Sequence, residues 1–169
     1  MSGVLSDNVG RAGGLVKAAG GGGKVAQGVT ASTDTFITTT TAIPGDNTLP
    51  QNSEGVEIVT LAITPTNASS TLIIWVHAPE IANTTANQYK SLALFKDSDA
   101  DAIFACTEYS NDTAMKNMSF VHSQSAGSTS EQTFKLRGGN GNLGTFQINL
   151  SGQFGTIDRT SITIMEVLP

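Results

Sequence analysis

The chain has 169 residues, which suits a single domain and is long enough to bury a hydrophobic core without disulfides or metals. Only 14% of the residues are charged, and 14 acidic against 9 basic residues give a net charge of −5. The lysines and arginines are scattered singly along the chain, which argues against a phosphate-binding basic patch and so against a nucleic-acid partner.

Residues 1–24 differ in composition from the rest of the chain. Glycines interrupt any regular element, yet apolar and cationic residues recur between them, which a purely flexible linker would not need. We expect an extended arm that becomes ordered against a partner, with a disordered tail as the alternative. The expected docking residues are Val4, Leu5, Val9, Arg11, Leu15, Val16 and Lys17.

After the arm, short segments rich in β-branched and apolar residues alternate with turn-forming residues. The spacing predicts strands over residues 24–31, 35–43, 56–64, 71–78, 89–96, 102–108, 115–122, 131–137, 143–150 and 161–168. No segment has a convincing helical pattern. The sequence therefore predicts an all-β fold, an antiparallel jelly-roll sandwich over residues 25–169.

Three of these segments carry more specific expectations. The run 71–78 is the most apolar and predicts a central strand buried on both faces, which Pro79 ends before a polar loop over 81–88. Segments 89–96 and 102–108 predict a hairpin. Segments 131–137 and 143–150 predict a second hairpin, closed by a glycine turn at 138–144.

The one cysteine, Cys106, excludes an internal disulfide, and its apolar neighbours predict a small core residue. The N-terminus has no signal-peptide pattern, so we expect synthesis in a cytoplasm. No run reaches the roughly 18 apolar residues that a membrane span needs, so no membrane partner is expected.

Several apparent motifs fail on inspection. Residues 139–144 match G-x-G-x-x-G, but a strand pattern follows where a dinucleotide site needs a helix. Gly20–Lys24 resembles a P-loop, but Val25 stands where Ser or Thr is required. Neither stretch supports a nucleotide cofactor.

Asp97, Asp99 and Asp101 have the spacing of the first ligands of an EF-hand. The sixth position is Ala102 where the calcium loop needs glycine, so a polar hairpin tip is expected, with adventitious cation binding left open. His77 and His122 end apolar strands and lack the partners of a zinc site. We expect no catalytic residue, no cofactor and no metal, and therefore no enzyme.

Several stretches together resemble small virion proteins of tailed phages. The stretches that carry the resemblance are residues 2–14, 43–57, 61–74, 92–97 and 161–166. It is a pattern of turns and strand edges and contains no catalytic signature. It implies a jelly roll of the tumour-necrosis-factor-like kind, assembled as a homotrimer and located in the virion.

Such domains serve as decoration or cement proteins on phage heads, or as binding heads at the tips of fibres. A fibre normally needs a shaft, and this chain has neither heptads nor repeats. We therefore expect a decoration protein whose arm docks on the major capsid protein or another virion protein. In the alternative, a fibre head, loops 81–88 and 123–130 would contact a host glycan or receptor.

Overall fold

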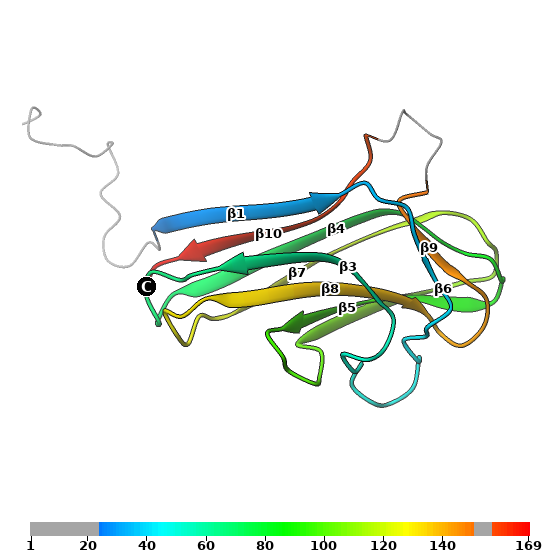
Figure 1. The fold of residues 1–169 in the computed structure, drawn as a ribbon, viewed down its shortest axis with the longest axis horizontal. Coiled ribbons are helices and arrows are strands. Elements are labelled where there is room, and N and C mark those ends of the chain that lie inside the picture. Colours follow the sequence, from blue (N-terminus) through cyan, green and yellow to red (C-terminus); the bar gives the residue numbers. More distant parts are fainter. Residues whose placement is uncertain (1–23, 151–156) are drawn as a thin grey trace, which may run out of the picture.

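The computed structural model describes residues 24–150 and 157–169, and within them the chain is entirely β-strand, turn and loop. The strands are β1 (Val25–Thr33), β2 (Ile37–Thr39), β3 (Val56–Ile63), β4 (Thr71–Asn83), β5 (Gln88–Lys96), β6 (Phe104–Ser110), β7 (Lys116–Ser125), β8 (Gln132–Asn140), β9 (Phe146–Ile148) and β10 (Thr160–Val167). Figure 1 shows them as two layers with the long strands running along the molecule.

The strand order is that of a jelly roll. The first sheet has the order β1-β10-β4-β7, and the second has the order β3-β8-β5-β6. The two short strands, β2 and β9, extend the first sheet, because β9 pairs with both β2 and the last two residues of β4. Numbered one to eight in chain order, the long strands give 1-8-3-6 facing 2-7-4-5, so the predicted antiparallel jelly-roll sandwich is confirmed.

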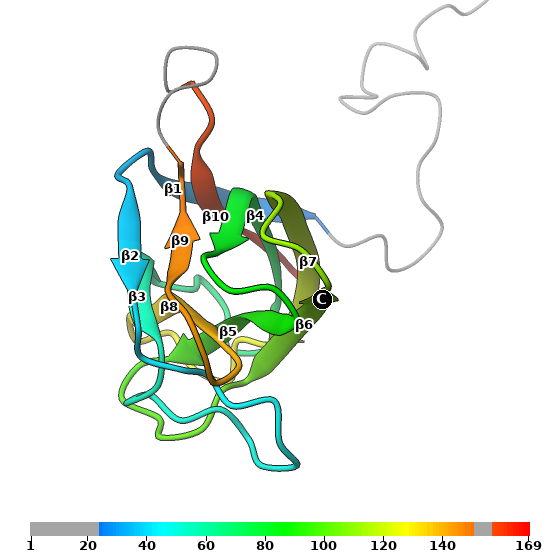
Figure 2. The ribbon, with the colours of Figure 1, turned by 90° about the vertical axis from the view of Figure 1, so that its right-hand side faces the viewer.

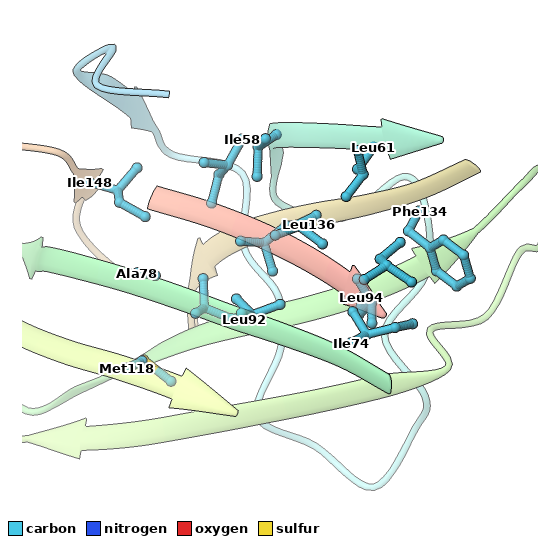
Figure 3. Packing of buried hydrophobic residues seen from close by; sticks show 14 of the residues in the cluster. Ile58, Leu61, Ile74, Ala78, Leu92, Leu94, Met118, Phe134, Leu136 and Ile148 are labelled. Atoms are coloured by element: carbon cyan, nitrogen blue, oxygen red, sulfur yellow. The ribbon is translucent and has the colours of Figure 1, made fainter. Parts of the chain in front are cut away.

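Period-two alternation explains how the sheets meet. Every second residue of β10, and of β4 from Thr71 to Ala78, is buried, while the residues between them are more exposed. Ile74 of the first sheet faces Leu94, Leu136 and Phe134 of the second, as Figure 3 shows. All four side chains are fully buried, so the core lies between the two layers.

The structure corrects the expectations for β4. The strand continues past Pro79 to Asn83, because Pro79 and Glu80 form a bulge between the Ala78–Met118 and Ile81–Lys116 pairs. A bulge leaves residues out of the ladder, so the missing N–H of proline costs no strand hydrogen bond there. The strand is central, as expected, but only one face is buried, since Trp75 is half-buried and His77 is exposed.

Of the two expected hairpins, one is confirmed and one is wrong. β5 and β6 pair in antiparallel register from Gln88–Ser110 to Leu94–Phe104. β8 instead runs on to Asn140 and is already paired on both sides, with β3 and β5. No edge of β8 is left for residues 143–150, so β9 joins β2 and β4.

One carboxylate is buried in the first sheet. Glu166 of β10 is fully buried and points inward with Ile162 and Ile164. Its carboxylate accepts hydrogen bonds from Gln27 Nε2 at 2.8 Å, Thr66 N at 2.9 Å and Asn67 N at 3.1 Å. Burial acts to raise the pKa of Glu166, but the hydrogen bonds from Gln27 and Thr66 outweigh it and lower the pKa to about 2. This anion therefore holds the turn after β3 against β1 and β10.

Candidate functional site: an uncharged sheet face

The predicted docking residues of the arm, Val4 to Lys17, lie outside the described residues. The first described residue, Lys24, is fixed at one end of the sandwich, where its carbonyl oxygen accepts a hydrogen bond from Leu168 N at 2.9 Å. The chain before Lys24 therefore joins the domain beside the end of β10.

In the rows from Thr71 to His77, the outward face of the first sheet carries no Asp, Glu, Lys or Arg. The partly exposed Glu80 lies in the bulge beyond these rows. Strand register places its side chains in rows, and one row runs from Thr30 through Thr163 and Trp75 to Val121. We call this surface the uncharged face and define it by the outward residues of the four strands in the rows from Thr71 to His77. They are Gly28, Thr30, Ser32, Thr71, Ile73, Trp75, His77, Ser119, Val121, Ser123, Ser125, Ser161, Thr163, Met165 and Val167.

A shallow groove of about 370 Å³ lies in the middle of the uncharged face. Trp75, Val121 and Thr163 line it, together with His77 and Ser119. His77 Nδ1 lies 3.0 Å from Ser119 Oγ, so the rim is held by a polar contact between neighbouring strands. The groove combines an aromatic ring and an exposed aliphatic side chain with short hydroxyl side chains. This composition favours desolvation of the surface in a protein–protein interface.

The uncharged face ends at an unprotected sheet edge. β7 pairs with β4 alone, and from Asn117 to Ser125 it contains no charged residue and no proline. Soluble proteins normally protect an edge strand of this length with lysine, proline, a bulge or a covering segment. Face and edge together therefore form a continuous surface suited to contact with another protein.

The opposite face of the sandwich is charged. Glu57, Lys135 and Arg137 lie on the second sheet and line a separate groove of about 230 Å³. The Arg137 guanidinium is hydrogen-bonded within the domain, since Nε donates to Glu54 O at 2.7 Å and Nη2 donates to Gly55 O at 2.9 Å. The contrast between the two faces shows that the missing charge is a property of one surface and not only of the overall composition.

An exposed aromatic pair lies at the β4–β5 end, which faces the viewer in Figure 2. Tyr89 and Tyr109 are 39% and 51% exposed. Their ring centroids lie 5.1 Å apart in an edge-to-face arrangement. A Cβ on Gly45 would lie 3.0 Å from Cδ2 of Tyr89, so the loop before β3 packs closely on this ring, and a side chain at Gly45 would displace the ring by a few tenths of an ångström. The Tyr109 hydroxyl reaches Asn87 Oδ1 at 3.5 Å.

The two loops expected to bind a glycan do not meet. Thr84 N bonds Thr145 O at the β4–β5 end, whereas Ala126 N bonds Ser70 O at the end where β4 begins. They lie at opposite ends of β4, so no single ligand of small size contacts both. Residues 81–83, which were expected in the first loop, are buried strand.

Cys106, Asp97 and Asp101 contribute to the packing and hydrogen bonding of the fold. Cys106 packs against the core, as expected, and burial raises the pKa of its thiol to about 11. Asp97 Oδ1 accepts from Thr133 N at 2.7 Å, and Asp101 Oδ1 accepts from Gln51 Nε2 at 2.7 Å. Over residues 24–150 and 157–169, no three His, Cys, Asp or Glu side chains are grouped to hold a metal ion. In the same ranges, no helix is long and apolar enough to cross a membrane.

Sequence reasoning missed the uncharged face. The signal was present, because the alternate residues of 71–77, 119–125 and 161–167 are all uncharged. Interpreting 71–78 as buried on both faces hid it. Tyr89 and Tyr109 were also missed as a pair, since only the β5–β6 register places them opposite each other.

No family model and no curated relative matches the sequence. Among solved structures, the chain is similar to the C-terminal domain of EclA, a sugar-binding protein, at 15% identity and a TM-score of 0.40 over 83% of this chain and 84% of that one. It is also similar to the infectious bursal disease virus VP2 subviral particle, at 12% identity and a TM-score of 0.40 over 85% of this chain. The match spans 40% of the VP2 chain. The strand pairing establishes the β-sandwich, and neither similarity carries a functional argument.

Proposed function

We propose that the protein is a structural component of a virion, a homotrimeric decoration protein that docks on the capsid through residues 1–24 and stabilises the shell. It is not an enzyme and takes no cofactor. The observation that carries the assembly part of this proposal is the uncharged face with its unprotected β7 edge. The virion and the capsid partner rest on the sequence resemblance.

A second copy of the chain is the occupant that best fits the uncharged face. The net charge of −5 makes copies repel one another wherever charged surfaces meet. A face without Asp, Glu, Lys or Arg avoids that repulsion and also avoids the desolvation of unpaired carboxylates, ammonium groups or guanidinium groups on contact. Closed symmetric assembly would also cover the β7 edge in every subunit, which leaves no edge for open-ended pairing.

The position of Lys24 is compatible with docking through the arm. The arm joins the domain at the end beside the C-terminus of β10, where Lys24 O accepts a hydrogen bond from Leu168 N. Apolar residues of the arm would fill grooves on the capsid protein, and Arg11 and Lys17 would pair with carboxylates. A ligand that binds only the assembled shell stabilises it by mass action.

Deleting residues 1–23 tests this mode of docking. The truncated chain is expected to keep the strand content and trimeric mass of the full chain, because the described domain includes both sheets complete. It is expected to lose co-sedimentation with capsids that lack the protein. An intermediate control replaces Arg11 and Lys17 by glutamine, which should weaken binding and reduce its dependence on salt. Binding of the truncated chain equal to that of the full chain would contradict the proposal.

A second candidate function, glycan binding by a fibre head, is favoured by the Tyr89–Tyr109 pair. Exposed tyrosines offer an apolar ring and a polar hydroxyl together, and such groups are enriched in binding surfaces. Asn87 and Gln88 supply amide groups beside them.

A glycan array with the full chain tests this candidate. If the pair binds sugar, Tyr109→Ala is expected to lower the affinity for any glycan hit at least about tenfold, the loss of one stacking contact of about 1.4 kcal/mol. The matched control is Phe36→Ala, another exposed aromatic outside the pair, which should leave binding unchanged. An array without hits removes this candidate.

A further inference from the structure

Three polar side chains form a row across the inner face of the second sheet, close to its β4–β5 end. Lys90 of β5 is paired with Asn140 of β8 on one side and with Glu108 of β6 on the other. The next inward row on the same three strands is apolar, with Leu92 between Gly138 and Cys106. Directly paired residues on antiparallel strands have Cβ atoms about 5 Å apart, so the Lys90 and Asn140 side chains are immediate neighbours.

Lys90 and Asn140 are both fully buried, and both carry an atom without a partner. Among the described residues, neither Lys90 Nζ nor Asn140 Oδ1 has a hydrogen bond. Buried lysines are rare unless paired, and an unpaired buried ammonium is strongly unfavourable. Conversion of the Lys90 ammonium to a neutral amide would remove this cost.

The environment also prepares the lysine as a nucleophile. Burial lowers the pKa of Lys90, an effect that Lys116 reinforces and that Glu108 and Asp112 oppose. Desolvated lysines with a lowered pKa are the ones that react as amines. The amide of Asn140 is held in place, because its Nδ2 donates to Gly144 O at 2.5 Å.

We propose that Lys90 and Asn140 become joined by an isopeptide bond that forms spontaneously in the folded chain. The neutral Nζ of Lys90 attacks Cγ of Asn140, the new C–N bond forms, and the tetrahedral centre collapses with cleavage of the Cγ–Nδ2 bond. The proton lost from Nζ passes to the departing Nδ2, which leaves as ammonia. Glu108, the other neighbour of Lys90 in the row, would relay this proton, and its Oε1 also lies 3.9 Å from Lys116 Nζ. No oxidant, reductant or cofactor is needed.

The bond would close a loop of 51 residues, from position 90 to position 140. A covalent link of this kind stabilises the fold chiefly by restricting the unfolded chain, as a disulfide does. It needs no oxidising compartment, which suits a chain whose only cysteine is Cys106.

Intact-mass spectrometry of the purified full chain tests the proposal. The expected mass is lower than the sequence mass by about 17 Da, the loss of one ammonia. Proteolysis should release one branched peptide that contains both Lys90 and Asn140. Lys90→Arg and Asn140→Ala should each restore the full mass and lower the melting temperature by roughly 10 °C. Glu108→Gln should fold with an unchanged circular-dichroism spectrum. Its intact mass should stay at the full sequence mass, or should fall by the mass of one ammonia more slowly than that of the wild type.

Two controls make the result specific. Lys96→Arg, in the same strand, and Asn142→Ala, in the following turn, should both retain the mass deficit. Asn140 precedes Gly141, and a succinimide at that dipeptide would also remove ammonia. A deficit that persists in Lys90→Arg, or a wild-type chain that stays at its full sequence mass after prolonged incubation, would overturn the proposal.

Discussion

Replacing Val121 by glutamate is expected to convert the proposed trimer to monomers without unfolding the domain. Val121 lies on the edge strand β7 in the same row as Trp75 and is 53% exposed in the single chain, so the domain can accommodate a charge there. Burying that carboxylate between subunits without a partner would cost about 3 to 4 kcal/mol per site, which corresponds to a loss of more than about a hundredfold in association. Light scattering coupled to size exclusion measures the change directly.

The matched control for Val121→Glu is Ala105→Glu. Ala105 is an exposed outward residue of β6, which is the corresponding edge strand of the second sheet. The control should remain trimeric, because that face already carries charge. If Val121→Glu stays trimeric and Ala105→Glu dissociates, the uncharged face is not the subunit contact.

Replacing Glu166 by alanine is expected to lower the free energy of unfolding by about 3 kcal/mol. The substitution leaves the part-buried N–H groups of Thr66 and Asn67 without their charged acceptor, and a hydrogen bond to a charged group contributes about 1.5–3 kcal/mol. Denaturant unfolding at neutral pH and fixed chain concentration checks this value. Glu131→Ala, at an exposed position, is the control and should change stability by less than about 0.5 kcal/mol.

The same carboxylate predicts how stability depends on pH. The pKa of Glu166 in the folded chain, about 2, lies below its ordinary value of 4.5. Its stabilisation is therefore fully present above pH 4.5 and is lost as the pH falls from 4.5 toward 2. Wild-type stability should decrease over that window, and the decrease should be smaller in Glu166→Ala. Parallel curves for the two chains would show that Glu166 does not carry the effect.

The sequence predicted the strands well where alternation was clean. Segment 56–64 became β3, and 89–96 with 102–108 became the β5–β6 hairpin, because a buried face opposite an exposed one requires period two. The prediction that Pro79 ends the strand was wrong, because a residue without an N–H can lie in a bulge as readily as at a strand end. Turn glycines misled at 138–139, where glycine is required by packing: a Cβ on Gly138 would lie 2.6 Å from Phe146 Cζ.

The candidate surfaces were less predictable than the strands. The uncharged face depends on which strands become neighbours, and β10 lies between β1 and β4 although nearly the whole chain separates it from β1. The row of Lys90, Asn140 and Glu108 likewise exists only through strand register. Local patterns give alternation within a strand, but they do not give the partner across the sheet.

The copy number of the protein in purified virions tests the central claim most directly. Quantitative mass spectrometry against the major capsid protein gives the ratio. Decoration of the head lattice by trimers predicts on the order of hundreds of copies per particle, in a fixed ratio to the capsid protein. Absence from the particle, or only a handful to a few tens of copies, would contradict decoration, and the low copy number would favour a fibre head.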